Sequence, residues 1–146
     1  MKKALTFLTI FTAVMLIYGS SARTAVQSEG IIEIKEKFFI TQTNEIYLNA
    51  EEYIGKTIKY EGLFGTYEQP NGEKRYFVIR YGPGCCSFDS NAGFEVYWNN
   101  QYPAPNDWVE AVGVLEEYED EGIKYLRLAL NSLTVMQTRG KETVLR

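Results

Sequence analysis

The sequence predicts an all-β fold, a small five-stranded barrel with one short helix. Five β-rich segments follow one another, and the turn sequences Pro70-Asn71-Gly72 and Asp120-Glu121-Gly122 separate two neighbouring pairs of them. The first and fourth segments each contain an interior glycine, Gly62 and Gly113, which is typical of strands that bend or bulge. These features favour a partly open Greek-key barrel of the oligonucleotide/oligosaccharide-binding (OB) type over a generic β-sandwich.

The first 22 residues predict a signal peptide. Lys2 and Lys3 precede an uncharged run of 19 residues ending at Ala22, and the small residues Ser20 and Ala22 fit a cleavage site. An uncleaved N-terminal anchor is the alternative, because a bilayer-spanning helix needs about 20 apolar residues. We therefore expect an extracytoplasmic protein, secreted or attached to the outer face of the cell membrane. It would contact the membrane only through this segment, and only if the segment stays uncleaved.

The rest of the chain predicts one domain. Residues 23–30 are polar and suggest a flexible linker, residues 31–141 form the OB-like β domain, and residues 142–146 are a tail. Within the domain, segments 31–35 and 38–40 are expected to be extended. Residues 49–55 predict a single helical turn, because Asn49 can cap the free amides at its start and Gly55 suits a left-handed stop.

Alternating apolar and polar residues define the barrel strands. They are expected at residues 57–64, 74–81, 94–98, 108–115 and 123–130, with a last extended piece at 133–136. Pro103 and Pro105 require a loop between the third and fourth strands. Residues 89–93 are expected to form a turn, because they match a calcium-binding loop only in part.

Charge and composition exclude several classes of function. The chain has a net charge of −4, and removal of the signal peptide leaves 13 basic and 19 acidic residues, a charge of −6. That balance argues against a nucleic-acid partner and against binding to an anionic membrane through basic patches. The chain contains no histidine, so histidine-dependent catalysis and histidine metal ligands are excluded.

The only two cysteines, Cys85 and Cys86, follow a Gly-Pro-Gly corner, and Asp89 lies three residues beyond the second. A disulfide between adjacent cysteines would be strained, because their Cα atoms lie about 3.8 Å apart and ordinary disulfides need about 4.4–6.8 Å. Cys85, Cys86 and Asp89 are therefore candidate ligands for a zinc or copper ion, which thiolates suit. Alternatively, one cysteine packs in the core and the other lines a turn, or both thiols serve a redox reaction.

Several sequence segments resemble one known family. They are Glu36-Lys37-Phe38-Phe39-Ile40, Asn44-Glu45-Ile46-Tyr47, Glu52-Tyr53-Ile54-Gly55-Lys56, Phe77-Val78-Ile79-Arg80, Cys85-Cys86-Ser87-Phe88-Asp89 and Trp108-Val109-Glu110. Their order resembles the C-terminal extracytoplasmic domain of an uncharacterised bacterial membrane-protein family whose members commonly sit beside a predicted permease. The resemblance covers roughly residues 31–141, and its most specific part is the CCxxD motif. It implies a permease partner and a link to transport or metal homeostasis, but no established activity.

The leading functional hypothesis is an exported, non-enzymatic binding domain that is accessory to a membrane permease and binds a soft metal ion at the Cys-Cys corner. A thiol-based redox protein is the first alternative. An oligosaccharide- or peptide-binding module is the second, and it would use aromatic residues that, on β-strands, more often serve core and cross-strand packing. These residues are Tyr76, Phe77, Tyr81, Phe94, Tyr97, Trp98 and Trp108.

Overall fold

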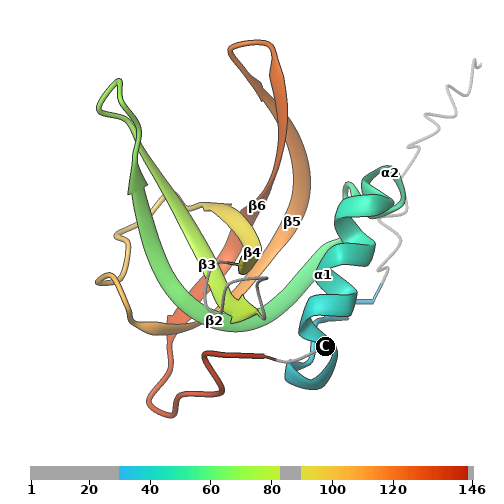
Figure 1. The fold of residues 1–146 in the computed structure, drawn as a ribbon, viewed down its shortest axis with the longest axis vertical. Helices are drawn as coiled ribbons and strands as arrows, with labels where there is room; N and C mark the ends of the chain where they lie inside the picture. Colours follow the sequence, from blue (N-terminus) through green and yellow to red (C-terminus); the bar gives the residue numbers. More distant parts are fainter. Residues whose placement is uncertain (1–29, 83–89, 145–146) are drawn as a thin grey trace, which may run out of the picture.

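The protein folds into a closed five-stranded β-barrel. The computed structural model describes residues 30–82 and 90–144. The barrel strands are β2 (Thr57–Glu68), β3 (Lys74–Gly82), β4 (Ser90–Tyr97), β5 (Trp108–Asp120) and β6 (Ile123–Val135). They are ordered β2-β3-β4-β6-β5, β2 pairs with β5 to close the ring, and only the β4–β6 pair within this barrel is parallel (Figure 1). This arrangement confirms the predicted all-β, OB-like barrel.

The N-terminal part of the domain covers one side of the barrel (Figure 1). The short strand β1 (Ile32–Glu33) pairs in parallel with β2. It is followed by η1 (Glu36–Phe38), α1 (Phe39–Leu48) and α2 (Ala50–Tyr53). No helix in the described part of the chain is long and apolar enough to cross a membrane.

The expectation that residues 38–40 are extended is wrong, because this segment enters α1. The buried side chains of α1 are Phe39, Thr43 and Ile46, whose spacing places them on one helical face against the barrel. The predicted helical turn at 49–55 is present as α2, and Gly55 takes the left-handed conformation with φ of 86°. Asn49 does not cap it as expected, since its amide instead donates to the Glu45 carboxylate at 2.8 Å.

The strands are longer than the sequence pattern predicts. β6 continues through residues 131 and 132, and β4 begins at Ser90, so the expected turn at 89–93 is wrong for residues 90–93. The reason is Gly93, whose φ of 141° lets β4 pack against β3 so closely that a Cβ would lie 2.1 Å from the Val78 carbonyl oxygen. Strand pairing therefore runs through a glycine-containing segment that looks like a turn in the sequence.

The two interior glycines lie at close backbone contacts, as predicted. A Cβ on Gly62 would lie 2.7 Å from the Ile79 carbonyl oxygen, and a Cβ on Gly113 would lie 2.7 Å from the Ala129 carbonyl oxygen. The β5–β6 register also shifts between Val112 and Gly113, which is a β-bulge.

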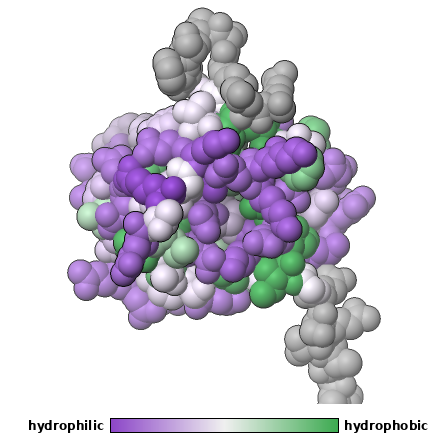
Figure 2. Space-filling model, turned by 90° about the horizontal axis from the view of Figure 1, so that it is seen from below, coloured by the Kyte–Doolittle hydropathy of each residue, from purple (hydrophilic) through white to green (hydrophobic). Residues whose placement is uncertain are grey.

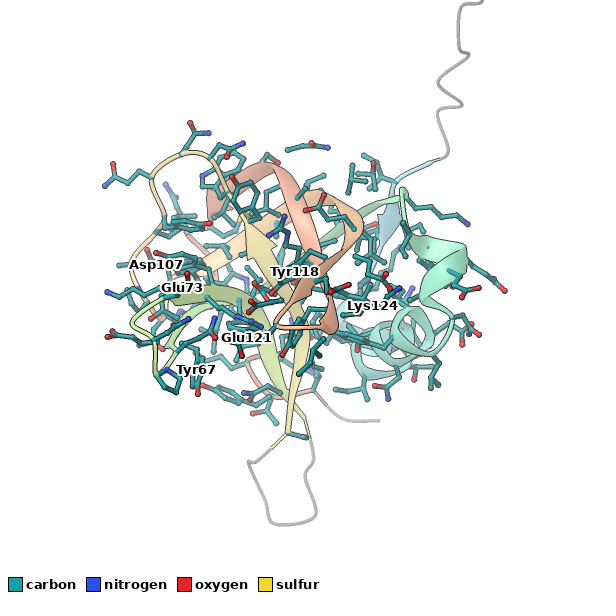
Figure 3. The ribbon with its side chains drawn as sticks, turned by 90° about the horizontal axis from the view of Figure 1, so that it is seen from above. Tyr67, Glu73, Asp107, Tyr118, Glu121 and Lys124 are labelled. Carbon is teal, nitrogen blue, oxygen red and sulfur yellow. The ribbon has the colours of Figure 1, made fainter. Side chains whose placement is uncertain are left out.

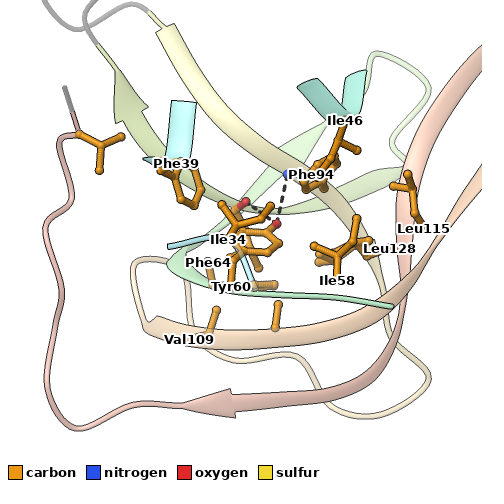
Figure 4. Packing of buried hydrophobic residues seen from close by; sticks show 14 residues of the cluster. Ile34, Phe39, Ile46, Ile58, Tyr60, Phe64, Phe94, Val109, Leu115 and Leu128 are labelled. Carbon is orange, nitrogen blue, oxygen red and sulfur yellow. Dashed lines mark hydrogen bonds between the residues drawn. The ribbon is translucent and has the colours of Figure 1, made fainter. Parts of the chain in front are cut away.

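The barrel interior is filled by side chains (Figure 4). At its centre the buried Tyr60 hydroxyl donates to the Val78 carbonyl at 2.9 Å and accepts the Phe94 amide hydrogen at 3.1 Å. Phe39 and Ile46 of α1 complete this core from the side. Figure 2 shows a mostly hydrophilic face with small apolar patches. Because the interior is packed, a ligand has to bind on the outside of the barrel or between its hairpins.

Candidate functional site

A cleft of about 570 Å³ lies between the β2–β3 hairpin and the β5–β6 hairpin. The two hairpins rise from the barrel as separate arms (Figure 1), and Figure 3 views them from above, with Glu73 on one and Tyr118 on the other. We call this hollow the interhairpin cleft. It is lined by residues 69, 73–76, 95–98, 102, 118–120 and 127. OB-type barrels bind their ligands at the corresponding place, over the second and third barrel strands, here β3 and β4, and between the loops that correspond to these two hairpins.

Arg75 joins the two sides of the interhairpin cleft. Its guanidinium forms an ion pair with Asp120 at the end of β5 and lies 3.7 Å from the Glu95 carboxylate on β4. The same group lies over the rings of Tyr125 and Tyr118, at 4.4 and 5.8 Å from their centroids. Arg75, which belongs to the β2–β3 hairpin, therefore links that hairpin to the β5–β6 hairpin and to β4.

Arg127 forms a second, similar arrangement on β6. Its Nε donates to the Glu116 carboxylate at 2.6 Å, and its guanidinium lies 4.7 Å from the Tyr97 centroid and 4.5 Å from the Tyr118 centroid. The Tyr118 hydroxyl donates to Glu95 at 2.7 Å. Burial, and then this hydrogen bond, raise the pKa of Tyr118 above its ordinary value of 10.0, so the hydroxyl stays protonated even in alkaline solution.

Aromatic residues form one wall of the interhairpin cleft. Tyr76 on β3 stacks on Tyr102 from the β4–β5 loop with ring centroids 3.7 Å apart, and both rings stack on Phe64. The Tyr102 hydroxyl accepts the backbone N–H of Trp98 at 2.9 Å, which ties the loop to the end of β4. Tyr97 is 46% exposed. The stacked rings of Tyr76 and Tyr102 are thus held in place, whereas the ring of Tyr97 is exposed.

The charges of the interhairpin cleft nearly cancel. Its lining contains three cationic side chains, Lys74, Arg75 and Arg127, and the four carboxylates Glu73, Glu95, Glu119 and Asp120. The two arginines are already engaged by carboxylates. The cleft therefore offers fixed hydrogen-bonding groups and aromatic surface, but little net field for an ionic ligand.

The predicted metal ligands Cys85, Cys86 and Asp89 lie outside the described residues. Gly82 of β3 and Ser90 of β4, the described residues that flank segment 83–89, are paired with each other. Gly82 and Arg75 lie near opposite ends of β3. Because a strand rises about 3.3 Å per residue, Gly82 and Ser90 lie well away from Arg75 and the interhairpin cleft. Among residues 30–82 and 90–144, no three Cys, Asp or Glu side chains gather closely enough to hold a metal ion.

The seven aromatic residues singled out from the sequence lie in different places. Phe94 and Trp108 are buried in the barrel, and Tyr76, Tyr97 and Trp98 line the interhairpin cleft. Phe77 lines a separate hollow, and Tyr81 is half-buried near the end of β3. Sequence reasoning missed the contributions of Arg75, Tyr102, Tyr118 and Arg127. A usable signal was the placement of arginine and tyrosine near the tips of predicted hairpins.

A protein-family model described as the DUF1980 C-terminal domain matches residues 18–142 of the chain. No curated protein matches the chain.

Proposed function

The chain belongs to the DUF1980 C-terminal domain family, and on that premise we propose that it is a non-enzymatic ligand-binding domain. The observation that supports this proposal is the interhairpin cleft, which occupies the usual ligand position of an OB-type barrel. Its arginines and carboxylates hold one another in place. Such prearranged groups favour recognition, because little side-chain ordering remains to be done when a ligand binds.

Tryptophan fluorescence tests the proposal directly. The chain has two tryptophans, Trp98 in the cleft and Trp108, which is 1% exposed. We expect a saturable change in emission when the full chain is titrated with at least one of three probe classes: neutral hexasaccharides, short peptides or single-stranded oligonucleotides. The change should disappear in Trp98→Phe, while the emission of Trp108 stays constant. No saturable response to any class would contradict the proposed function.

We further propose that the domain acts outside the cytoplasm, as an accessory to a membrane permease. The support is the export-signal pattern in the first 22 residues and the permease association implied by the resemblance. Intact mass of the cell-associated protein should give an N-terminus at Arg23. A full-length mass in the membrane fraction would instead identify residues 4–22 as an anchor. Failure of a tagged neighbouring permease to co-purify with the domain would remove the accessory role.

A soft-metal site at Cys85, Cys86 and Asp89 is the second proposal. It is supported by the residue types and by the pairing of the flanking residues Gly82 and Ser90. Protein purified under reducing conditions should contain zinc or copper by elemental analysis, and Asp89→Asn should lower the content. Uptake should weaken at low pH, because thiolate ligands must be deprotonated. A metal-free protein that turns over a dithiol substrate, with loss of turnover in Cys86→Ser, would favour the redox alternative.

A further inference from the structure

We infer that the ligand of the interhairpin cleft is a neutral oligosaccharide. This inference rests on the proposed function, which places a ligand in that cleft, and it goes further by naming the chemical class. Three properties of the cleft carry it: the balance of its charges, its exposed aromatic surface, and its mixture of fixed donors and acceptors.

The charge balance disfavours a polyanion. Binding a nucleic acid releases counterions only if unpaired lysines and arginines face the phosphates. Arg75 is engaged by Asp120 and Glu95, and Arg127 is engaged by Glu116. Lys74 is the third cation of the lining, and the two further carboxylates Glu73 and Glu119 offset its charge. Phosphates that contact either arginine would have to displace its carboxylates, whereas a neutral ligand can leave each ion pair intact.

The aromatic surface suits sugar rings. Pyranose C–H bonds carry partial positive charge, and the face of an aromatic ring carries partial negative charge, so the two attract when stacked. Arg127 covers part of the Tyr97 ring, but Tyr97 remains 46% exposed beside Trp98. The remaining surface of Tyr97 is open to a ligand. The stacked pair Tyr76–Tyr102 continues the same wall into the cleft.

Sugar hydroxyls need donors and acceptors side by side, because each hydroxyl is both. The interhairpin cleft supplies this mixture from the guanidinium of Arg75 and the carboxylates of Glu95 and Asp120. A guanidinium has five N–H donors and a carboxylate about four lone-pair positions, so ion pairing leaves capacity on both partners. The volume of about 570 Å³ lies within the usual range of about 300–1,000 Å³ for ligand sites.

A peptide is disfavoured by the backbone of the cleft. Extended peptides commonly bind by adding a strand to a free sheet edge. At the floor of the cleft, Glu95, Val96 and Tyr97 of β4 are already paired with Arg127, Leu128 and Ala129 of β6. This stretch of β4 therefore offers no open edge toward β6. Lys74, Arg75 and Tyr76 of β3 pair with β2 alone and leave a free edge of only three residues, which is at the short limit for a strand, so recognition depends mainly on side chains.

The experiment uses the full chain, with Trp98 emission as the reporter. The probes are linear neutral hexasaccharides of hexoses and of N-acetylhexosamines, a short neutral peptide and a single-stranded oligonucleotide. Tyr97→Ala removes the exposed stacking ring, whereas Tyr97→Phe retains the ring and removes only the hydroxyl. Tyr67→Ala is the matched control, because Tyr67 is also an exposed strand tyrosine, 57% against 46% for Tyr97, and lines a separate hollow with Tyr47 and Phe77.

We expect saturable binding of a neutral hexasaccharide. Tyr97→Ala should weaken it about tenfold or more, as expected for the loss of a stacking ring, whereas Tyr97→Phe and Tyr67→Ala should bind like the wild type. The affinity should not change between about 50 and 500 mM salt, since screening acts on charges. Saturation by the peptide or the oligonucleotide alone would overturn the saccharide inference and leave the proposed function standing. Saturation by none of the probes would overturn both. So would a saccharide-induced emission change that is unaltered in Tyr97→Ala and persists in Trp98→Phe, because that change would arise outside the interhairpin cleft.

Discussion

At the scale of single residues, the described part of the chain depends on one buried cation. Arg80 is 3% exposed, and its guanidinium lies between the rings of Phe39 and Trp108, at 5.1 and 4.7 Å from their centroids. It donates to the Glu61 carbonyl at 2.8 Å and to the Glu36 carboxylate at 3.0 Å. The N-terminal segment and two barrel strands thus meet at one side chain.

Arg80→Met should therefore destabilise the fold by about 2–4 kcal/mol, because methionine keeps the apolar stem but removes the hydrogen bonds to the Glu61 and Lys141 carbonyls and the ion pair with Glu36. Urea unfolding followed by circular dichroism measures the effect. The matched control is Arg139→Met, which removes an exposed arginine that pairs with Glu142. It should change stability by less than about 0.5 kcal/mol. Equal effects of the two substitutions would show that the burial of Arg80 does not matter.

Glu36 should make stability depend on pH. A hydrogen bond from the Lys141 backbone N–H, and then one from Arg80, lower the pKa of Glu36 from its ordinary value of 4.5. Stabilisation by a carboxylate with a lowered pKa is present above about pH 4.5 and is lost as the pH falls through the folded-state pKa. Wild type should therefore exceed Glu36→Gln in stability at pH 7, and the gap should shrink below about pH 4.5. Urea titrations at both pH values check this, with the exposed-site substitution Glu68→Gln as the control; a gap that does not depend on pH would contradict it.

At the scale of elements, Gly113 of β5 faces a bulge in β6, where Asn131 is the extra residue between the partners of Val112 and Gly113. Gly113→Ala should destabilise by about 1–3 kcal/mol, because its Cβ would lie 2.7 Å from the Ala129 carbonyl oxygen, which belongs to the backbone of β6. Gly65→Ala on β2 is the control, since no atom lies within 4 Å of its Cβ position. Thermal unfolding should separate the two variants. An unchanged melting temperature for Gly113→Ala would mean that β6 can move away at no cost.

Local sequence patterns predict the strands of this fold better than its main helix. The centres of the barrel strands and the bends at Gly62 and Gly113 follow from local alternation and glycine placement, which need only neighbouring residues. The helix α1 was missed because Phe38-Phe39-Ile40 reads locally as an apolar run, and its buried face includes a threonine. That Thr43 hydroxyl donates to the Phe39 carbonyl at 2.7 Å, so only the helical backbone makes its burial acceptable.

The interhairpin cleft could not be predicted in the same way. Arg75 meets Asp120 across 45 residues of sequence, and Tyr76 meets Tyr102 through a proline-containing loop. Such contacts depend on how two hairpins twist toward each other, which local patterns do not specify. The sequence did indicate aromatic residues in a binding role, but it could not separate Tyr97, which is exposed, from Phe94, which is buried.

At the scale of the whole molecule, fold and charge point to different ligands, and charge decides between them. An OB-type barrel accommodates oligonucleotides as readily as oligosaccharides. This chain has a net charge of −4, and the ionic side chains that line its cleft are three cationic and four anionic. We therefore expect the wild type not to bind a fluorescent single-stranded oligonucleotide in an anisotropy titration.

Reversing two exposed charges should change that outcome. Glu73→Lys combined with Glu119→Lys leaves the ion pairs of Arg75 and Arg127 in place and gives the interhairpin cleft a clear excess of positive charge. The double variant should bind the oligonucleotide, and its affinity should fall as salt rises, because phosphate contacts release counterions. Glu51→Lys combined with Glu52→Lys on α2 adds the same charge away from the cleft and should bind much more weakly. Equal binding by the two variants would mean that net charge alone attracts the oligonucleotide, and salt-sensitive binding by the wild type would show that the carboxylates of the cleft do not exclude nucleic acid.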